Sequence, residues 1–365
     1  MQTCLRTSLL LSVFLVSAFA NNAFAQSKTP TIVDREKEGK LDFKIGAKVV
    51  TTYNYGPTVA KPYFWPVVTL GENRVTRDWP MLQDSPEAKD HKHQKSIWFC
   101  HGDVIPEGIE LKQKTKGVTG VDFWSEETNF GKIVCVKVGK IEGGASTASV
   151  STMNEWRTAD GIKIMDETRS FTLETAGNGY IIKMSTSLIA SVCPITFGDT
   201  KEGSFGVRIR DSVTEKEKKG GILTNASGKQ TEKDVWGIES PWCDYSGPCD
   251  KGTAGITIIA DSANALKSCW HSRGYGLMAA NPFGRDKAGF PDRKGNKELV
   301  KLPKDGVLKL SFGLYIHDGS AIEAKVKDVA GKSEDTLIVS DEQKALKVRR
   351  LRKWLGNRGI FYNAW

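Results

Sequence analysis

The feature that most constrains this chain is a repeated alternation of apolar and polar residues. In the run VLKLSFGLYIH every second residue from Leu308 to Ile316 is apolar, and SFGVRIR sets Phe205 and Val207 against Arg208. Clusters of glycine, asparagine and aspartate separate such runs. A period of two indicates strands with one buried face, and frequent turn signals between them indicate antiparallel pairing. The pattern therefore predicts an all-β protein.

The length of the alternating region suits a single large domain. About 300 residues of body fit one large two-sheet antiparallel β-sandwich, and no repeat of fixed period divides it. We predict a signal peptide over residues 1–25, a β-sandwich domain over 26–332 and a basic C-terminal helix or tail over 333–365. The oligomeric state is not predicted by any feature of the sequence.

The amino-terminal segment has the three parts of a secretory signal. Arg6 precedes an apolar run from Leu9 to Ala20, and small residues at Ala23 and Ala25 follow. The run is shorter than the ~20 apolar residues of a membrane helix, and no later stretch reaches that length. We expect cleavage after Ala25, no transmembrane segment, and a periplasmic or secreted protein.

Six cysteines remain after that cleavage, and an oxidising compartment would permit disulfides among them. Cys243 and Cys249 bracket the sequence WCDYSGPC, whose Ser-Gly-Pro is typical of a turn. Such a turn would bring the two sulfurs together and form a local bridge. The alternative is that these cysteines are buried free thiols, packed as small apolar side chains.

The formal charge of +9 does not indicate a nucleic-acid partner. Seven basic residues lie in the last part of the chain, from Lys344 to Arg358, and the rest of the mature chain is almost neutral. Nucleic-acid binders carry their basic patch on the folded domain, so we expect none here. Ser340 and Gln343 form a capping-box pattern before this stretch. The basic helix would contact anionic lipid weakly, or would be solvated or docked on the body.

Three of the five histidines fall within the segment DHKHQKSIWFCHGDV. His91 and His93 are two residues apart, so on a strand they would share a face and offer two imidazoles to one ligand or metal ion. His271 and Arg273 in CWHSRGYG would share a face in the same way. A zinc, iron or copper site on His91 and His93 would still require a third ligand.

The other two histidines have a structural alternative. His101 follows the apolar run SIWFC, and His317 ends an alternating strand. A single histidine is often a hydrogen-bonded structural residue, so either of them could be buried rather than functional.

Other polar and aromatic residues add to these histidines. Glu202 stands at a turn before the strand that carries Arg208; it would be a general base in a cleft or one half of a surface pair. Several tryptophans stand beside polar residues, as in DFWSEE and NEWRTADG. Indole faces with nearby carboxylates and amides bind sugar rings, although tryptophans are also common in sandwich cores.

Together these segments resemble a family of exported bacterial proteins known as PmoA-like. The matching segments run in order from about Lys61 to Gly319 and include KPYFWPVVTLGENRVTRDWP, DHKHQKSIWFCHGDVIPEG, GDTKEGSFGVRIRDS and CWHSRGYGLMAANPFG. The name refers to a methane oxygenase subunit with several membrane-spanning helices, which this sequence lacks, so an oxygenase is disfavoured. The resemblance implies a galactose-mutarotase-like β-supersandwich, a fold found among carbohydrate enzymes and binding modules.

The residues and the resemblance lead to one functional prediction, an exported protein that acts on a sugar or glycoside by histidine and glutamate acid–base chemistry without a cofactor. We expect catalytic roles for His91, His93, Glu202, His271 and Arg273. We expect ligand contacts from Arg77, Asp78, His101, Arg208, Asn281 and His317. The alternatives are a non-catalytic sugar-binding module and a metal protein.

We have two further expectations for the five residues with predicted catalytic roles, one about their geometry and one about their chemistry. His91, His93 and His271 should converge with Glu202 and Arg273 on one concave face of the sandwich. A histidine in that cleft should have a pKa near 6–7, where imidazole exchanges protons most readily at neutral pH.

Overall fold

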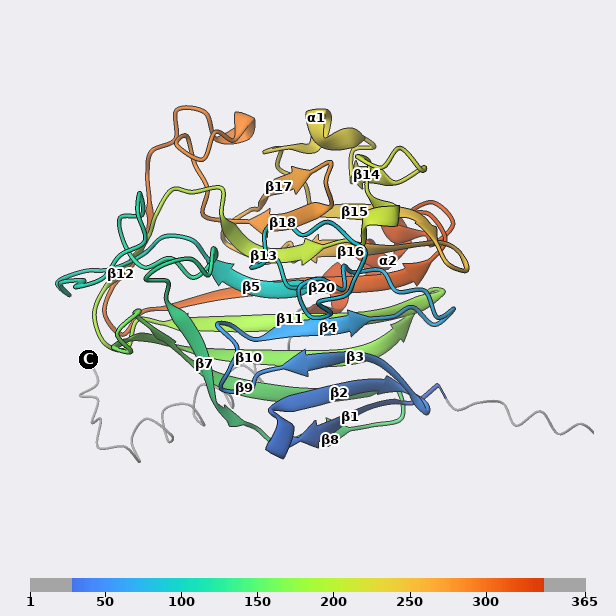
Figure 1. The fold of residues 1–365 in the computed structure, drawn as a ribbon, viewed down its shortest axis with the longest axis horizontal. Helices are drawn as coiled ribbons and strands as arrows, with labels where there is room; N and C mark the ends of the chain where they lie inside the picture. The colour runs from blue at the N-terminus through green and yellow to red at the C-terminus, as the bar shows by residue number, and fades with distance from the viewer. Residues whose placement is uncertain (1–27, 338–365) are drawn as a thin grey trace, which may run out of the picture.

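The computed structural model describes residues 28–337, and antiparallel β-sheet dominates it (Figure 1). The first sheet has eight strands in the order β1-β2-β3-β4-β5-β13-β18-β17. Their bounds are β1 (Pro30–Arg35), β2 (Lys40–Ile45), β3 (Lys48–Asn54), β4 (Tyr63–Val67), β5 (Ile97–His101), β13 (Gly203–Arg208), β18 (Leu277–Asn281) and β17 (Cys269–Arg273).

The second sheet has nine strands in the order β14-β15-β16-β20-β11-β10-β9-β7, with β8 also paired to β9. Their bounds are β14 (Ile222–Asn225), β15 (Trp242–Cys249), β16 (Gly252–Ala260), β20 (Val307–Asp318), β11 (Gly179–Ile189), β10 (Lys163–Ala176), β9 (Thr147–Arg157), β7 (Lys132–Val138) and β8 (Glu142–Gly143). A small third sheet has the order β19-β12-β6. It consists of β19 (Val300–Leu302), β12 (Ile195–Phe197) and β6 (Val104–Pro106).

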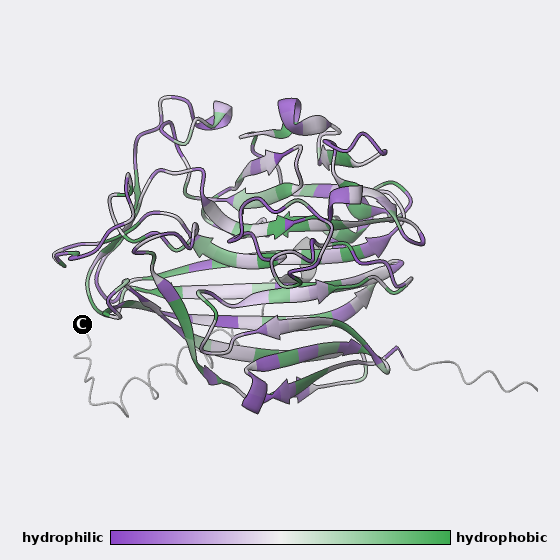
Figure 2. Cartoon of the chain, viewed as in Figure 1, coloured by the Kyte–Doolittle hydropathy of each residue, from purple (hydrophilic) through white to green (hydrophobic). Residues whose placement is uncertain are grey.

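The two large sheets pack face to face through aromatic side chains. Phe64 of the first sheet lies 5.2 Å from Phe171 of the second, measured between ring centroids, and Phe205 lies 5.3 Å from Phe312. Figure 2 shows hydrophobic bands along the strands of both sheets, with hydrophilic residues between them and in many of the connecting loops. The prediction of an all-β protein built from large antiparallel sheets is confirmed.

The alternation in β20 shows how tertiary contacts modify the sequence pattern. Lys309 is exposed while Leu310 and Phe312 are buried, as the alternation predicts. From Leu314 onward both faces are buried, because Tyr315 packs against Ala324 and the first turn of helix α2 (Val326–Leu337). The helix α2 thus begins before the predicted tail. Short helices elsewhere are η1 (Glu36–Glu38), η2 (Asp211–Val213), α1 (Thr231–Val235) and η3 (Pro291–Arg293).

The predicted disulfide between Cys243 and Cys249 is wrong. Both cysteines lie on the single strand β15, and Gly247 between them pairs with Ala254 of β16 instead of forming a turn. Six residues of extended chain span ~20 Å, which is far beyond the reach of a disulfide. The Cys243 thiol donates to the carbonyl of Thr224, and all six cysteines of the described chain are free.

Two of the predictions concern residues outside the range 28–337. The signal peptide of residues 1–25, with its cleavage after Ala25, and the basic stretch from Lys344 onward both lie outside the described residues. Within the described part of the chain, no helix is long and apolar enough to cross a membrane.

Candidate functional site

A cleft of about 660 Å³ lies over the first sheet. Its walls come from the turn that carries His91 and His93, the loop around Trp124, the loop that ends at Glu202, and the end of β17 with His271. Arg273 and Tyr275 line it as well. The structure thus brings together all five of the residues predicted to be catalytic, from three separate segments of the chain.

The register of the sheet explains why the cleft forms on its outer face. Phe205 contacts the second sheet, so its neighbour Gly206 faces outward, and Gly206 pairs with Trp98 of β5 and with Ala279 of β18. Ala279 in turn pairs with His271 of β17. Residues directly opposite one another on paired strands share a face. Two small residues therefore separate Trp98 from His271 and leave a trough between them.

His271 presents an unsatisfied polar atom to this cleft. Its side chain is 3% exposed, and its Nδ1 atom has no hydrogen-bond partner. The Nδ1 atom lies 3.9 Å from Oε2 of Glu202, too far for a direct hydrogen bond. A buried polar group without a partner is costly, so this atom is suited to receive a hydrogen bond from a ligand.

Glu202 is placed by the loop that precedes β13. Its carbonyl accepts a hydrogen bond from the backbone N–H of Gly102 at 2.7 Å, and a Cβ at position 102 would lie 2.7 Å from the Cβ of Glu202. Asn281 fixes the same loop, since its side-chain amide donates to the carbonyls of Thr200 and Lys201. The Glu202 carboxylate remains one-third exposed, 3.3 Å from the ammonium of Lys201.

The histidine pair lies on a turn, and the prediction that it lies on a strand is wrong. Gln94 donates its backbone N–H to the carbonyl of His91, and His91 has a φ of +41°, in the left-handed region. The two rings are nevertheless close, with centroids 5.7 Å apart. His91 stacks on Tyr275 at 5.1 Å, and His93 lies 6.4 Å from Trp124.

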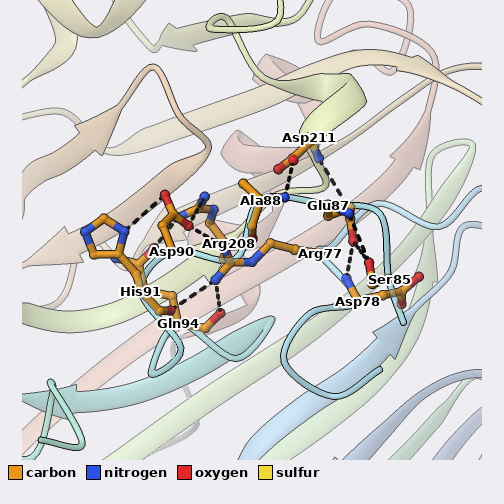
Figure 3. Close-up of polar contacts among 10 residues, drawn as sticks. All are labelled: Arg77, Asp78, Ser85, Glu87, Ala88, Asp90, His91, Gln94, Arg208 and Asp211. Carbon is orange, nitrogen blue, oxygen red and sulfur yellow. Dashed lines mark hydrogen bonds and ion pairs between the residues drawn. The ribbon is translucent and has the colours of Figure 1, made fainter. Parts of the chain in front are cut away.

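Two buried arginines hold this turn through one carboxylate (Figure 3). Arg77 and Arg208 both donate to Oδ1 of Asp90, at 2.5 and 2.8 Å, and the other oxygen lies 3.2 Å from Nδ1 of His91. Although burial raises the pKa of Asp90, Arg208 and Arg77 together hold it below its usual range. Arg208 also bonds the side chain of Gln94 at 2.7 Å.

Trp124 forms the aromatic wall of the cleft. Its ring is nearly parallel to that of His271, at 24° and 6.2 Å, and packs edge-on against Trp98. The buried Lys61 donates to the carbonyl of Trp124 at 3.0 Å, and Asp122 accepts its backbone N–H at 2.7 Å. Both backbone polar groups of Trp124 are therefore bonded, which fixes the position of the residue that carries the indole.

The electrostatics of the cleft differ from the predicted acid–base pattern. Burial lowers the pKa of His271 to about 3, with a contribution from Arg273, and lowers the pKa of His93 to about 3, with a contribution from Lys61. Both imidazoles are therefore neutral at pH 7, and the expected pKa of 6–7 is wrong for them. Burial raises the pKa of Glu202 above its usual range.

None of the six residues predicted to contact the ligand lines the cleft. His101 shares the face of Phe99, which points toward the second sheet, so it is buried and bonds the carbonyl of Gly198 at 2.8 Å. His317 is fully buried and bonds Asp244 at 2.8 Å. The prediction of ligand contact is wrong for both histidines.

The other four predicted contact residues support neighbouring segments. Arg77 and Arg208 hold the histidine turn, and Asn281 holds the loop of Glu202. Asp78 accepts from Trp65 and Arg74 away from the cleft.

Sequence reasoning missed other residues of the site. Tyr275 follows His271 and Arg273 at the same spacing of two, a signal that would have placed it on the same wall. The role of Asp90 has no such local signal, because its arginine partners are 13 and 118 residues away. Across the residues that the structure describes, no group of three or more histidine, cysteine, aspartate or glutamate side chains is placed to hold a metal ion. The metal alternative has no ligand set there.

The fold and the cleft define a large antiparallel β-sandwich protein with a cleft of imidazole, carboxylate and indole groups on the outer face of one sheet. The chain belongs to a family of unknown function, DUF6807, which it matches over residues 40–331. That description includes no function, so the resemblance to PmoA-like proteins stays a prediction. No curated protein matches the chain.

Solved structures of similar architecture are distant in sequence. A Synechocystis protein is 10% identical, with a TM-score of 0.39, 80% of this chain and 97% of that chain being covered. Galactose 1-epimerase from Lactobacillus acidophilus is 8% identical, with a TM-score of 0.37 and coverage of 80% and 100%. A galactose mutarotase-like protein from Lactobacillus casei is 12% identical, with a TM-score of 0.35 and coverage of 79% and 100%.

Proposed function

We propose that this protein is carbohydrate-active and that a sugar binds in the cleft between Trp124 and the pair of His271 and Glu202. The observation that carries the proposal is the Nδ1 atom of His271, which is buried, unpartnered and 3.9 Å from the Glu202 carboxylate. Two neighbouring hydroxyls of a sugar would donate one hydrogen bond to Nδ1 of His271 and one to the Glu202 carboxylate, while the indole of Trp124 covers the apolar face of the ring.

In this proposal Glu202 carries the proton transfer. Its carboxyl has a raised pKa, which suits an acid or base working near neutral pH. Neutral His271 accepts a hydrogen bond from the ligand. Arg273, whose guanidinium pairs with Glu232 at 2.8 Å, supplies positive charge at the same wall. The reaction would be a hydrolysis, elimination or epimerisation on a sugar or glycoside.

The second candidate is a non-catalytic sugar-binding module. It is favoured by the two cleft imidazoles with pKa values of about 3, since such groups carry few protons at neutral pH. In that case the same side chains only hydrogen-bond hydroxyls.

Ligand binding and turnover are measured on one panel of free sugars, glycosides and keto-sugars, by thermal shift and by proton NMR of the sugar. We expect at least one compound to raise the unfolding temperature of the wild type. Glu202→Gln and His271→Gln should lose that shift or that turnover while remaining folded. Turnover identifies an enzyme, binding without turnover identifies the module, and no binding by any compound refutes the proposal.

We also propose that the protein is exported, on the strength of the amino-terminal segment that ends at Ala25. Expression of the full chain in a bacterial host, followed by fractionation and intact mass, tests this. A mature chain that begins at Gln26 in the periplasm or medium supports export. A cytoplasmic chain that retains Met1 contradicts it.

A further inference from the structure

The charged side chains that line the cleft are unequal in number. Five carboxylates face three cationic groups. The carboxylates belong to Asp103, Asp122, Glu127, Asp199 and Glu202, and the cations to Lys201, Arg273 and Lys287. Since the histidines with lowered pKa values are neutral at pH 7, this balance makes the potential inside the cleft negative.

Two of the three cations of the cleft already have counter-ions. Lys201 lies 3.3 Å from Glu202, and Arg273 pairs with Glu232 at 2.8 Å. Lys287, the third, is exposed to solvent, which screens its charge. An anionic ligand would therefore have to compete with an existing ion pair at Lys201 and at Arg273.

Other buried cations lie near the cleft without lining it. Arg77 and Arg208, behind the histidine turn, both donate to Asp90, at 2.5 and 2.8 Å, and Lys61 pairs with Glu126 at 2.7 Å. They supply no free positive charge to a ligand.

Two of the cleft carboxylates are also occupied, by backbone N–H groups. Asp199 accepts from the N–H groups of Arg285, Lys287 and Ala288, at 2.6, 2.6 and 3.0 Å. Asp122 accepts from Trp124 at 2.7 Å. These carboxylates stabilise loops, and a cationic ligand would gain little from them. The unpartnered polar atom that faces the cleft is Nδ1 of His271, on a neutral ring.

Building on the proposed carbohydrate function, we propose that the cleft accepts an uncharged polyhydroxylated ring and discriminates against the same ring bearing a carboxylate or a phosphate. The neutral ring exchanges hydrogen bonds with His271 and Glu202 without a charge of its own. An anion enters a negative site whose Lys201 and Arg273 are already paired, and it loses its hydration, so it is rejected.

The test uses matched series built on glucose, galactose and mannose, each as the free sugar, the uronic acid and the 6-phosphate. Affinities are measured by calorimetry on the full mature protein at low and at physiological salt. We expect the neutral member to bind at least tenfold more tightly than its uronic acid and 6-phosphate. The difference in affinity between the neutral sugar and its anionic derivatives should decrease at the higher salt concentration, because salt screens the charges.

A charge-reversal variant tests the cause. Glu127 is exposed at the lining of the cleft, and Glu127→Lys should raise the affinity for the uronic acid several-fold at low salt while leaving the neutral sugar unchanged. A variant with an unchanged ratio of the two affinities would show that the charge argument is wrong.

The outcomes separate this inference from the proposed function. Equal or tighter binding of a uronic acid or a 6-phosphate overturns the charge selectivity and leaves the carbohydrate function standing. A complete lack of binding in all three series overturns the carbohydrate function, and the charge selectivity falls with it.

Discussion

Nδ1 of His271 and Oε2 of Glu202 lie 3.9 Å apart across the cleft, although 69 positions separate these residues in the sequence. The distance exceeds that of a hydrogen bond, and neither group satisfies the other. Two neighbouring hydroxyls of a ligand could donate one hydrogen bond to each of them. This relationship makes the pair the centre of the candidate site.

The lowered histidine pKa values predict acid sensitivity. His271 has a folded-state pKa of about 3 against an ordinary value of 6.5, so the unfolded chain binds a proton that the folded chain does not. The stability is full above about pH 6.5 and falls as the pH decreases, by up to about 1.4 kcal/mol per pH unit for this residue. The free energy of unfolding, measured with urea at pH 7, 6 and 5, should fall less steeply with decreasing pH for His271→Gln than for the wild type.

The matched control for that measurement is Val118→Ala, which alters the lining of the same cleft without a titratable group and should keep the wild-type dependence of stability on pH. If the free energy of unfolding changes equally with pH in the wild type and in His271→Gln, His271 does not titrate as its burial implies.

The Asp90 carboxylate should be essential to the histidine turn. In Asp90→Asn the buried Arg77 and Arg208 lose their shared counter-ion. We expect a loss of about 2 kcal/mol in the free energy of unfolding, at the low end for buried pairs because Asp90 is 37% exposed. Sugar affinity should fall at least tenfold as His91 and His93 lose their position.

Asp78→Asn is the control for Asp90→Asn, because Asp78 pairs with the exposed Arg74 away from the cleft. It should change the unfolding free energy by less than about 1 kcal/mol and leave sugar affinity unchanged. If both variants affect affinity equally, the specific role of Asp90 is refuted.

His317 should contribute to stability and not to ligand binding. Its pair with Asp244 is fully buried in the second sheet, and Asp244 also accepts from Thr257 at 2.8 Å. His317→Asn should cost about 3 kcal/mol, because it leaves the aspartate without its partner. Chemical denaturation and calorimetry on the same sample test this. A large loss of sugar affinity in a protein that remains folded would contradict the structural role.

The cysteines should all be reduced in the mature protein. The structure has six free cysteines, and the strand β15 keeps Cys243 and Cys249 apart. Alkylation of the denatured, unreduced protein should add six groups by intact mass. A product with four groups, rising to six only after reduction, would demonstrate a disulfide and contradict the arrangement of β15.

The predictable part of this protein rests on local patterns. Alternation along β20 and β13 indicates strands because the side chains of a strand point to opposite faces in turn, whatever surrounds them. The same rule placed His271 with Arg273 on one face of β17, and both line the cleft.

The remaining features depend on what covers each face, which no local pattern specifies. Arg208 alternates with apolar residues as an exposed residue would, yet the turn around Asp90 buries it. His101 and His271 both occur in strands that also contain tryptophan and cysteine. The sheet register nevertheless points His101 toward the second sheet and His271 into the cleft. The sequence by itself therefore determined the strands and the parity of their side chains. Only the tertiary structure decided which faces became part of the core, which arginines hold the histidine turn, and which side chains line the cleft. The reason is that burial and pairing arise from contacts between segments far apart in the chain.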